Sequence, residues 1–294
     1  MRLIDTRYTP AVPGKGKTNR TAKPGHLMTS KHEEFEQKLH KYYSSARERD
    51  RLSATSLGGL VELLAMRQAL GTIPKDSTIL DVGGGTGVHS AWLAEQGHLV
   101  TMIDPVPAHV EVARGYGTFS AKIGDARELA FTDSTFDAVL LLGPLYHLPS
   151  LTQRAQALSE CARILRPGGL LFAAGLSRVA SFINALLFTD GECVTNETLN
   201  LLKTGEWINS GEGFPGGHFH TAQELQEEIS TAGFSHVKVI GLELGLHYEF
   251  MAPDFGLAWQ VTGFNNDINR ALTPQASAAA AMLSPHLLAM ATIC

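Results

Sequence analysis

The sequence has few cysteines, no strong excess of charge and no long apolar run. Its three cysteines lie far apart and form no Cys-x-x-Cys pair, which excludes a zinc ribbon and indicates a reducing compartment. No apolar stretch approaches the roughly 18 to 20 residues of a membrane-spanning helix, and no signal-peptide core is visible. The net charge of −5 argues against a nucleic-acid-binding face. We therefore expect a cytoplasmic protein that binds a small molecule, and neither nucleic acid nor membrane.

The chain of 294 residues is long enough for one α/β domain with additional segments. Residues 1–29 are basic and poor in acids, which predicts a flexible tail, with an organelle transit peptide as the alternative. Residues 30–74 carry two amphipathic helical runs, the first beginning at a capping box formed by Ser30 and Glu33. These runs predict a helical cap in front of the main domain, which we place at residues 75–294.

The stretch Thr78–Gly87, with the sequence TILDVGGGTG, predicts a strand, a tight turn and the start of a helix. Its glycines allow positive φ angles and a close approach of the backbone to a ligand, and the helix start favours a negatively charged group. The dinucleotide pattern G-x-G-x-x-G fails here, because its sixth position is Val88 or Ser90. The residues from Asp81 onward fit D-x-G-x-G-x-G instead, and here the chain resembles the class I S-adenosylmethionine-dependent methyltransferases.

Further strand and helix signals follow in the order of that family. The strand 98–104 ends in an acid 19 residues after Gly85, and the strand 119–123 is followed by Gly-Asp-Ala. The other predicted strands are 136–142, 170–174, 237–240 and 286–290. Alternation of strands and helices requires a parallel α/β core. The fold prediction is a Rossmann-like, seven-stranded, mostly parallel sheet with helices on both faces, an N-terminal helical cap and lid inserts.

The resemblance implies S-adenosylmethionine as the cofactor. It places Asp104 against the ribose hydroxyls and Asp125 against the adenine amino group. The predicted cofactor-binding residues are Asp81, Gly83, Gly85, Gly87, Asp104, Pro105, Asp125, Ala126 and Leu142.

Methyl transfer to a hydroxyl or an acidic carbon also needs a base with a pKa near neutrality. His147 is the first candidate, because the loop after the fourth strand lies at the carboxyl edge of the sheet, and Tyr146 beside it is the second catalytic candidate. A structural histidine bonded to the backbone is the alternative. The predicted acceptor-binding residues are Tyr43, Tyr146, Trp207, His218 and His220. The pair His218 and His220 has no nearby acid at ligand spacing, so we expect no metal.

Two long segments interrupt the pattern. Residues 177–217 contain several aromatic side chains among glycines and predict a lid over the acceptor, although the same side chains could form a small core of their own. Residues 248–281, which include Trp259 and Phe264, either close the other side of the pocket or form a homodimer face.

Together these features predict an enzyme that methylates a small molecule, with oxygen or carbon acceptors favoured over nitrogen, in quinone-like or specialised metabolism. The first alternative is an NAD-dependent oxidoreductase, which the glycine spacing disfavours. The second is a catalytically silent partner subunit, which the intact set of cofactor residues disfavours.

Overall fold

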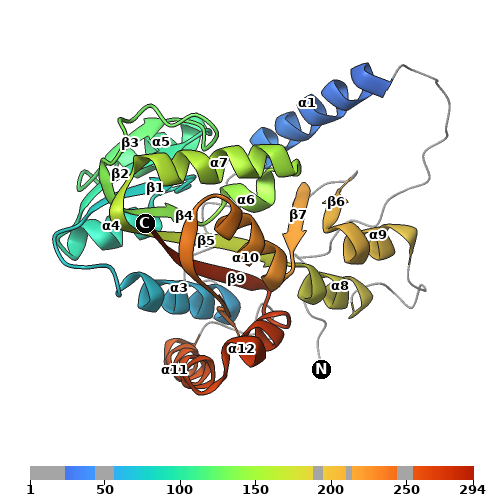
Figure 1. The fold of residues 1–294 in the computed structure, drawn as a ribbon. Helices are drawn as coiled ribbons and strands as arrows, with labels where there is room; N and C mark the ends of the chain where they lie inside the picture. The colour runs from blue at the N-terminus through green and yellow to red at the C-terminus, as the bar shows by residue number, and fades with distance from the viewer. Residues whose placement is uncertain (1–23, 44–55, 188–194, 210–213, 244–253) are drawn as a thin grey trace.

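The computed structural model describes residues 24–43, 56–187, 195–209, 214–243 and 254–294. They form one layered α/β structure around a nine-stranded sheet (Figure 1). The strands are β1 (Thr78–Val82), β2 (Leu99–Asp104), β3 (Ser120–Ile123), β4 (Phe136–Leu141), β5 (Leu165–Ser177), β6 (Glu206–Ile208), β7 (Gly216–His220), β8 (Phe234–Gly241) and β9 (His286–Ile293).

Helices join and cover these strands. They are α1 (Pro24–Tyr43), α3 (Leu57–Leu70), α4 (Val88–Glu95), α5 (Pro107–Arg114), α6 (Pro144–His147), α7 (Leu151–Ile164), α8 (Arg178–Leu187), α9 (Asn196–Thr204), α10 (Ala222–Thr231), α11 (Phe255–Ala271) and α12 (Pro274–Ala281). None of the helices in the described ranges is long and apolar enough to cross a bilayer.

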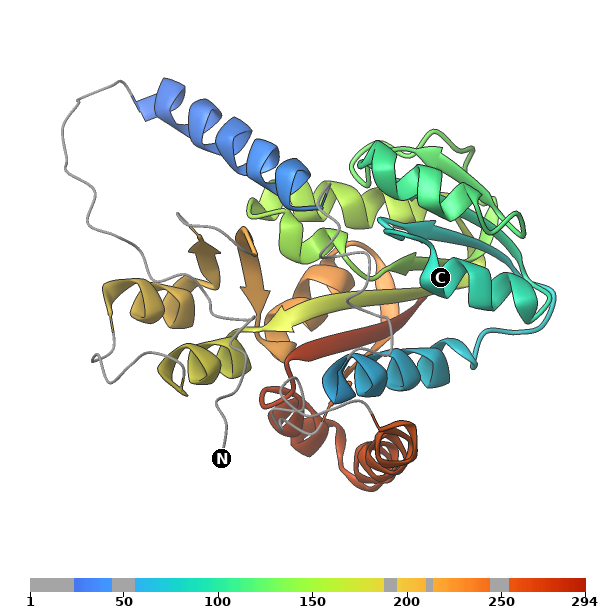
Figure 2. The same ribbon diagram turned by 180° about the vertical axis from the view of Figure 1, so that it is seen from behind.

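The core of the sheet confirms the predicted parallel α/β fold. Strands β3, β2, β1, β4 and β5 pair in parallel in that order, and β9 pairs antiparallel with both β5 and β8. Helices α7 and α10 bury their apolar sides on one face, and α3 and α4 cover the other. Strands covered on both faces have continuous apolar runs, which is why β4 is recognisable in the sequence. Figure 2 shows β5 and β9 side by side behind α3.

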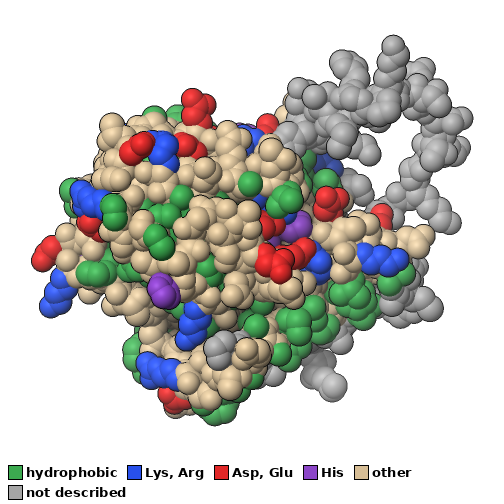
Figure 3. Space-filling model, in the orientation of Figure 1, with side chains coloured by type: hydrophobic (Ala, Val, Ile, Leu, Met, Phe, Trp, Pro, Cys, Tyr) green, Lys and Arg blue, Asp and Glu red, His purple; other side chains and the backbone are tan. Residues whose placement is uncertain are grey.

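The predicted count of seven strands is wrong by two. The additional strands, β6 and β7, form an antiparallel hairpin inside the segment 177–217, for which the sequence predicts a lid. Strand β7 joins β5 at Leu176 and Ser177, beyond the point where β4 ends. The described part of this segment also contains α8 and α9, so it has regular structure of its own. Hydrophobic side chains gather over these two helices on the face shown in Figure 3.

Two further segments, one before β1 and one after β8, are helical. Helix α1 begins at Pro24, so Ser30 lies inside the helix and does not cap it, while residues 1–23 lie outside the described part of the chain. In the segment 248–281, the described residues form α11 and α12, and α11 packs on the outer side of α3. Trp259 and Phe264 on α11 are exposed, and a homodimer at this face stays a prediction.

Candidate active site

A cavity of about 270 Å³ opens at the carboxyl ends of β1, β2 and β4. The glycine turn after β1 forms one wall, the residues after β3 and β4 form others, and side chains of α1 and α3 cover it. Eleven of the predicted site residues line it: Tyr43, Asp81, Gly83, Gly85, Asp104, Pro105, Asp125, Ala126, Leu142, Tyr146 and His147. Most of the predicted site residues therefore meet in one cavity.

Two glycines of the turn are required because a side chain at either position would collide with a neighbouring residue. Gly87 is not among the described lining residues; its φ is 85°, and a Cβ there would lie 2.6 Å from the ring of Phe119. Glycine is thus needed at Gly87 for packing at the start of α4. Gly84, which the glycine pattern does not single out, lines the cavity, and a Cβ there would lie 2.6 Å from the carboxylate of Asp81. This turn can therefore close around Asp81 only when residue 84 has no side chain.

Asp104, at the tip of β2, is held in place by three donors. Its Oδ2 accepts from the backbone N–H of Gly85 at 2.9 Å, and its Oδ1 accepts from that of Val106 at 2.9 Å. The Nδ1 of His109 lies 3.2 Å from Oδ1. Bonds from the glycine turn and from the residues that lead into α5 therefore fix the carboxylate at the cavity wall, where it retains acceptor capacity for a ligand hydroxyl.

Asp81 is the most deeply buried acid of the cavity. Only 2 % of its surface is exposed, and its Oδ2 accepts from the hydroxyl of Ser90 at 2.7 Å. Burial raises the pKa of Asp81 to about 6; the Ser90 bond opposes this rise, and the nearby Asp104 adds to it. A cationic group placed in the cavity would relieve the cost of this buried charge.

Asp125 is part of a chain of charges that reaches α1. Burial works against its charge, but the bonds from Arg127 outweigh burial and hold the pKa of Asp125 below its usual range. Arg127 donates from Nε and Nη2 to this carboxylate, and from Nη1 to Glu36 Oε1 at 3.0 Å. Both Arg127 and Glu36 line the cavity, and sequence reasoning missed both. The two residues lie 91 positions apart in the sequence, so no local sequence pattern predicts their contact.

The two predicted catalytic residues lie on α6, which starts at Pro144 and is separated from the end of β4 by two residues. Tyr43 Oη lies 2.6 Å from Nε2 of His147, and the two rings meet edge to face with centroids 5.0 Å apart. Tyr146 is buried, and its ring centroid lies 4.5 Å from that of His147. Helix α1 therefore contacts two sides of the cavity. Glu36 reaches the side where Asp125 lies, and Tyr43 reaches the side where His147 lies.

Four further histidines line the cavity beside His147, namely His40, His89, His109 and His286, and none of the four was predicted. His286, at the start of β9, lines it together with Glu62 of α3. Its Nδ1 lies 2.7 Å from Glu243 Oε1, and its Nε2 lies 3.9 Å from Glu62 Oε1. Glu243 also accepts from the hydroxyl of Ser284 at 2.7 Å. The buried carboxylate of Glu243 thus orients a histidine at the cavity wall, an arrangement typical of a general base.

Three of the predicted acceptor residues lie elsewhere. Trp207, His218 and His220 are not among the described residues that line the cavity, because they belong to the hairpin β6–β7. The ring of Trp207 packs against Phe219 with centroids 6.2 Å apart.

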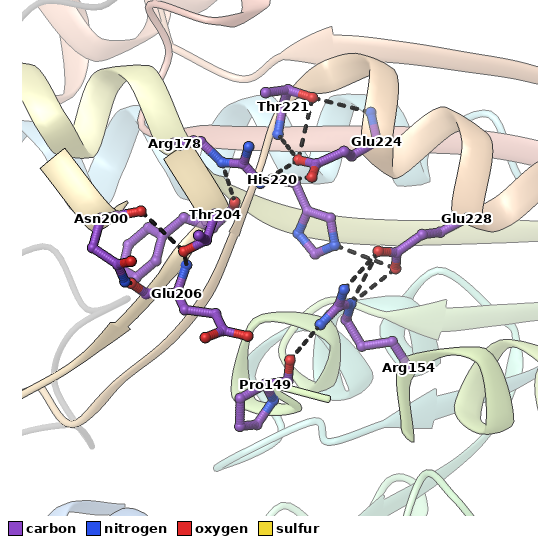
Figure 4. Close-up of polar contacts among 11 residues, drawn as sticks. Pro149, Arg154, Arg178, Asn200, Thr204, Glu206, His220, Thr221, Glu224 and Glu228 are labelled. Atoms are coloured by element: carbon purple, nitrogen blue, oxygen red, sulfur yellow. Dashed lines mark hydrogen bonds and ion pairs between the residues drawn. The ribbon is translucent and has the colours of Figure 1, made fainter. Parts of the chain in front are cut away.

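The two histidines of β7 are buried beside an acid. Nε2 of His220 lies 3.5 Å from Oε2 of Glu228, which forms an ion pair with Arg154 (Figure 4). Burial lowers the pKa of His218 to about 3, and burial also lowers that of His220. The expectation that no acid lies near this pair was wrong, because α10 brings Glu228 next to it.

Comparison with known proteins agrees with this geometry. Residues 80–173 match the family model described as a methyltransferase domain. Over 116 residues the chain is 39% identical to a ubiquinone biosynthesis O-methyltransferase from Xylella fastidiosa (strain M23), covering 37% of this chain and 46% of that protein. The protein of the same name from Xanthomonas oryzae pv. oryzae (strain PXO99A) is 40% identical over 116 residues, covering 37% and 47%. The chain thus spans about half the length of these curated relatives.

Solved structures show the same fold. A SAM-dependent methyltransferase from Thermotoga maritima superposes with a TM-score of 0.56 at 18% identity, over 86% of this chain and 98% of that one. An S-adenosylmethionine-dependent methyltransferase from Mesorhizobium loti has a TM-score of 0.50 at 18% identity, over 80% and 99%. The glycine turn, the acids at the ends of β1 and β2 and the parallel core all fall within the matched region. Residues 80–173 therefore carry a methyltransferase domain, and the chain has the fold of S-adenosylmethionine-dependent methyltransferases.

Proposed function

We propose that the protein transfers a methyl group from S-adenosylmethionine to an oxygen atom, or an activated carbon atom, of a small phenol-like acceptor in quinone-like metabolism. The observation that carries this proposal is that one cavity holds three acids on its cofactor side and a histidine bonded to a phenol on the other. The printed names of the curated relatives, which are O-methyltransferases of ubiquinone biosynthesis, support oxygen as the acceptor atom.

The residues of the cavity fit S-adenosylmethionine. A Cβ at Gly85 would meet no atom within 4 Å, so the backbone there is open to a close-lying ligand. In this proposal Asp104, which retains acceptor capacity, binds the ribose hydroxyls, and Asp125 binds the adenine amino group. Asp81 provides a buried negative charge for the ammonium group of the amino-acid end. When bound, this cofactor supplies a methyl group on a positively charged sulfur, and the protein contributes positioning and a dry pocket.

His147 is proposed as the base that takes the acceptor's proton. Its Nε2 holds the Tyr43 hydroxyl at 2.6 Å, and Tyr43 is itself a phenol. A phenolic acceptor that took the place of this hydroxyl would present its proton to Nε2 at hydrogen-bond distance. Leu39, Met66 and Leu148 line the cavity and would surround the acceptor ring.

His286 is the second candidate for the base, and a specific observation favours it. Glu243 is only 6 % exposed and accepts from Nδ1 of His286 at 2.7 Å, which leaves Nε2 as the basic atom. Because His147 and His286 sit on different elements of the same cavity, single substitutions separate their contributions. His286→Gln would be the informative change, since the amide keeps polarity without a titratable ring.

Calorimetric titration with S-adenosylhomocysteine, and with NAD in a parallel experiment, tests the cofactor. We expect binding of S-adenosylhomocysteine alone. Asp104→Ala should weaken it by about 10-fold or more, since charge-assisted bonds contribute about 1.5–3 kcal/mol each. Asp133→Ala, at an exposed acid of the same charge, serves as the control. Preference for NAD would refute the proposed cofactor.

Turnover with a panel of phenols, catechols and hydroxyquinones tests the chemistry. His147→Ala should lower kcat while leaving affinity for S-adenosylhomocysteine unchanged. Equal loss of both would assign His147 a structural role. A wild-type protein that binds the cofactor but methylates no acceptor of any class would support the silent-subunit alternative.

A further inference from the structure

The histidines of β7 are buried with unused nitrogen atoms. His218 and His220 are 5 % and 0 % exposed. Among the described residues, neither ring nitrogen of His218 has a hydrogen-bond partner, and neither has Nδ1 of His220. Leaving a buried polar atom unsatisfied costs about 1–3 kcal/mol, so three such atoms in one place need a physical explanation.

A carboxylate completes the cluster. His218 and His220 are two positions apart on one strand, so they lie on the same face, and their ring centroids are 4.5 Å apart. Glu228 approaches from α10 on the other side, as Figure 4 shows for its contact with His220. One ligand atom from each of the three residues lies within 4.8 Å of the other two. Two imidazoles and a carboxylate at this spacing have the chemistry and the geometry that a metal ion requires.

Arg154 fixes the orientation of the carboxylate. Its Nε and Nη2 donate to Glu228, while Nη1 donates to the carbonyl oxygens of Leu148 and Pro149. A carboxylate has about four acceptor positions, so Glu228 can bind both Arg154 and an ion. Such outer partners hold metal ligands in place at known sites. The same side chain also ties the cluster to the loop that directly follows His147.

We propose that His218, His220 and Glu228 bind a divalent transition-metal ion of the zinc type, which fastens β7 to α10. The two nitrogen donors favour such an ion over Mg²⁺ or Ca²⁺, which prefer oxygen ligands. Three protein ligands leave a fourth position for water. The site lies outside the cavity lining, so the proposal stands whether or not the protein is a methyltransferase. Through Arg154 and residues 148–149, the ion would stiffen the loop after the proposed base.

Titration of the chelator-treated full chain with Co²⁺ tests the site directly. We expect one Co²⁺ per chain, with visible absorption bands that Zn²⁺ abolishes by displacement. His218→Asn should weaken Co²⁺ binding by more than the roughly 10–100-fold that outer partners contribute. His236→Asn is the matched control, because it removes a histidine of β8 at a position with a φ of 52°, which asparagine tolerates.

A second cluster of possible metal ligands shows whether Co²⁺ binds at the proposed site or elsewhere. Glu62, Glu243 and His286 also meet the spacing of metal ligands, so Glu243→Gln must leave Co²⁺ binding unchanged. Loss of binding in Glu243→Gln, equal binding in His218→Asn, or no binding by the wild-type chain would each overturn the proposal.

The wild-type chain also gives evidence if His218→Asn does not fold. X-ray absorption of the Zn²⁺-loaded wild-type protein should show two imidazole ligands, and Zn²⁺ should raise its Tm. An oxygen-only shell would overturn the proposal in the same way.

Discussion

Asp81 offers the sharpest test of the electrostatics of this cavity. Its pKa rises from an ordinary 3.8 to about 6 because of burial. This shift corresponds to a difference of about 3 kcal/mol in the free energy of unfolding between low and high pH. A raised pKa means that the fold prefers the protonated acid. The contribution of protonated Asp81 to the stability of the fold is complete below pH 3.8 and is lost as the pH rises through about 6. At neutral pH the ligand-free protein therefore carries the full cost of a buried charge.

Asp81→Asn should remove that cost. The amide is neutral and nearly the same shape, and its oxygen can still accept from the Ser90 hydroxyl. We expect the variant to be more stable than wild type by up to about 3 kcal/mol at pH 8, with the gain vanishing near pH 4. Urea unfolding at several pH values measures this difference. The variant should also bind S-adenosylhomocysteine more weakly at pH 8, because it lacks the charge that we propose for the ammonium group of the ligand.

Asp137 provides a control, because its pKa is shifted in the opposite direction from that of Asp81. Burial raises its pKa, but bonds from the Thr78 backbone and from Arg166 outweigh burial and lower it. Its contribution is therefore present at neutral pH and lost as the pH falls through its lowered pKa. Asp137→Asn should lose stability at neutral pH and converge with wild type in acid. A stability difference for Asp81→Asn that stays constant across pH would refute the reasoning, as would a difference that follows the Asp137 pattern.

Three further outcomes are expected. Tyr43→Phe removes the hydroxyl that contacts His147, so kcat should change while affinity for S-adenosylhomocysteine stays within about 2-fold. Steady-state kinetics measures kcat and calorimetry measures the affinity. Equal effects on both would place Tyr43 in the cofactor site. Glu36→Gln breaks the link between α1 and Arg127, so stability should change by less than about 1 kcal/mol while stopped flow shows faster release of S-adenosylhomocysteine; an unchanged release rate would show that this contact of α1 does not retain the ligand. Burial raises the pKa of Cys161 to about 12, so its peptide should resist alkylation until urea unfolds the chain, as mass spectrometry would reveal; labelling of the native protein would show that the core opens locally.

The half of the cavity that we assign to the cofactor is predictable because its sequence signals are local. The turn after β1 and the acid at the end of β2 each follow a strand directly, and parallel strands bring their carboxyl ends to one edge. This rule alone places Asp81, Asp104 and Asp125 together. Each of these residues is identified by a few neighbours in the chain.

The half of the cavity that we assign to the acceptor depends on contacts between distant residues. Glu243 and His286 lie 43 residues apart, and Tyr43 and His147 lie 104 apart. Individual side chains such as Tyr43 are identifiable in the sequence, but their pairing is not. The sequence predicts a lid over residues 177–217, where the structure has β7. Gly217 in this strand lets the backbone pass against the carbonyl of Tyr146. Only the folded chain reveals that requirement.

The position of β9 links completion of the sheet to formation of the site. This strand pairs with β5 from Leu170 to Leu176 and with β8 on its other side. A chain that has left the ribosome only as far as Ala281 lacks the strand that joins them, so β5 and β8 face each other with unpaired edges, the kind of surface that recruits other chains. His286 reaches Glu243 only once β9 is seated. Completion of the sheet and assembly of this wall of the cavity thus depend on the same step, so a ligand that contacts the wall would stabilise the completed sheet.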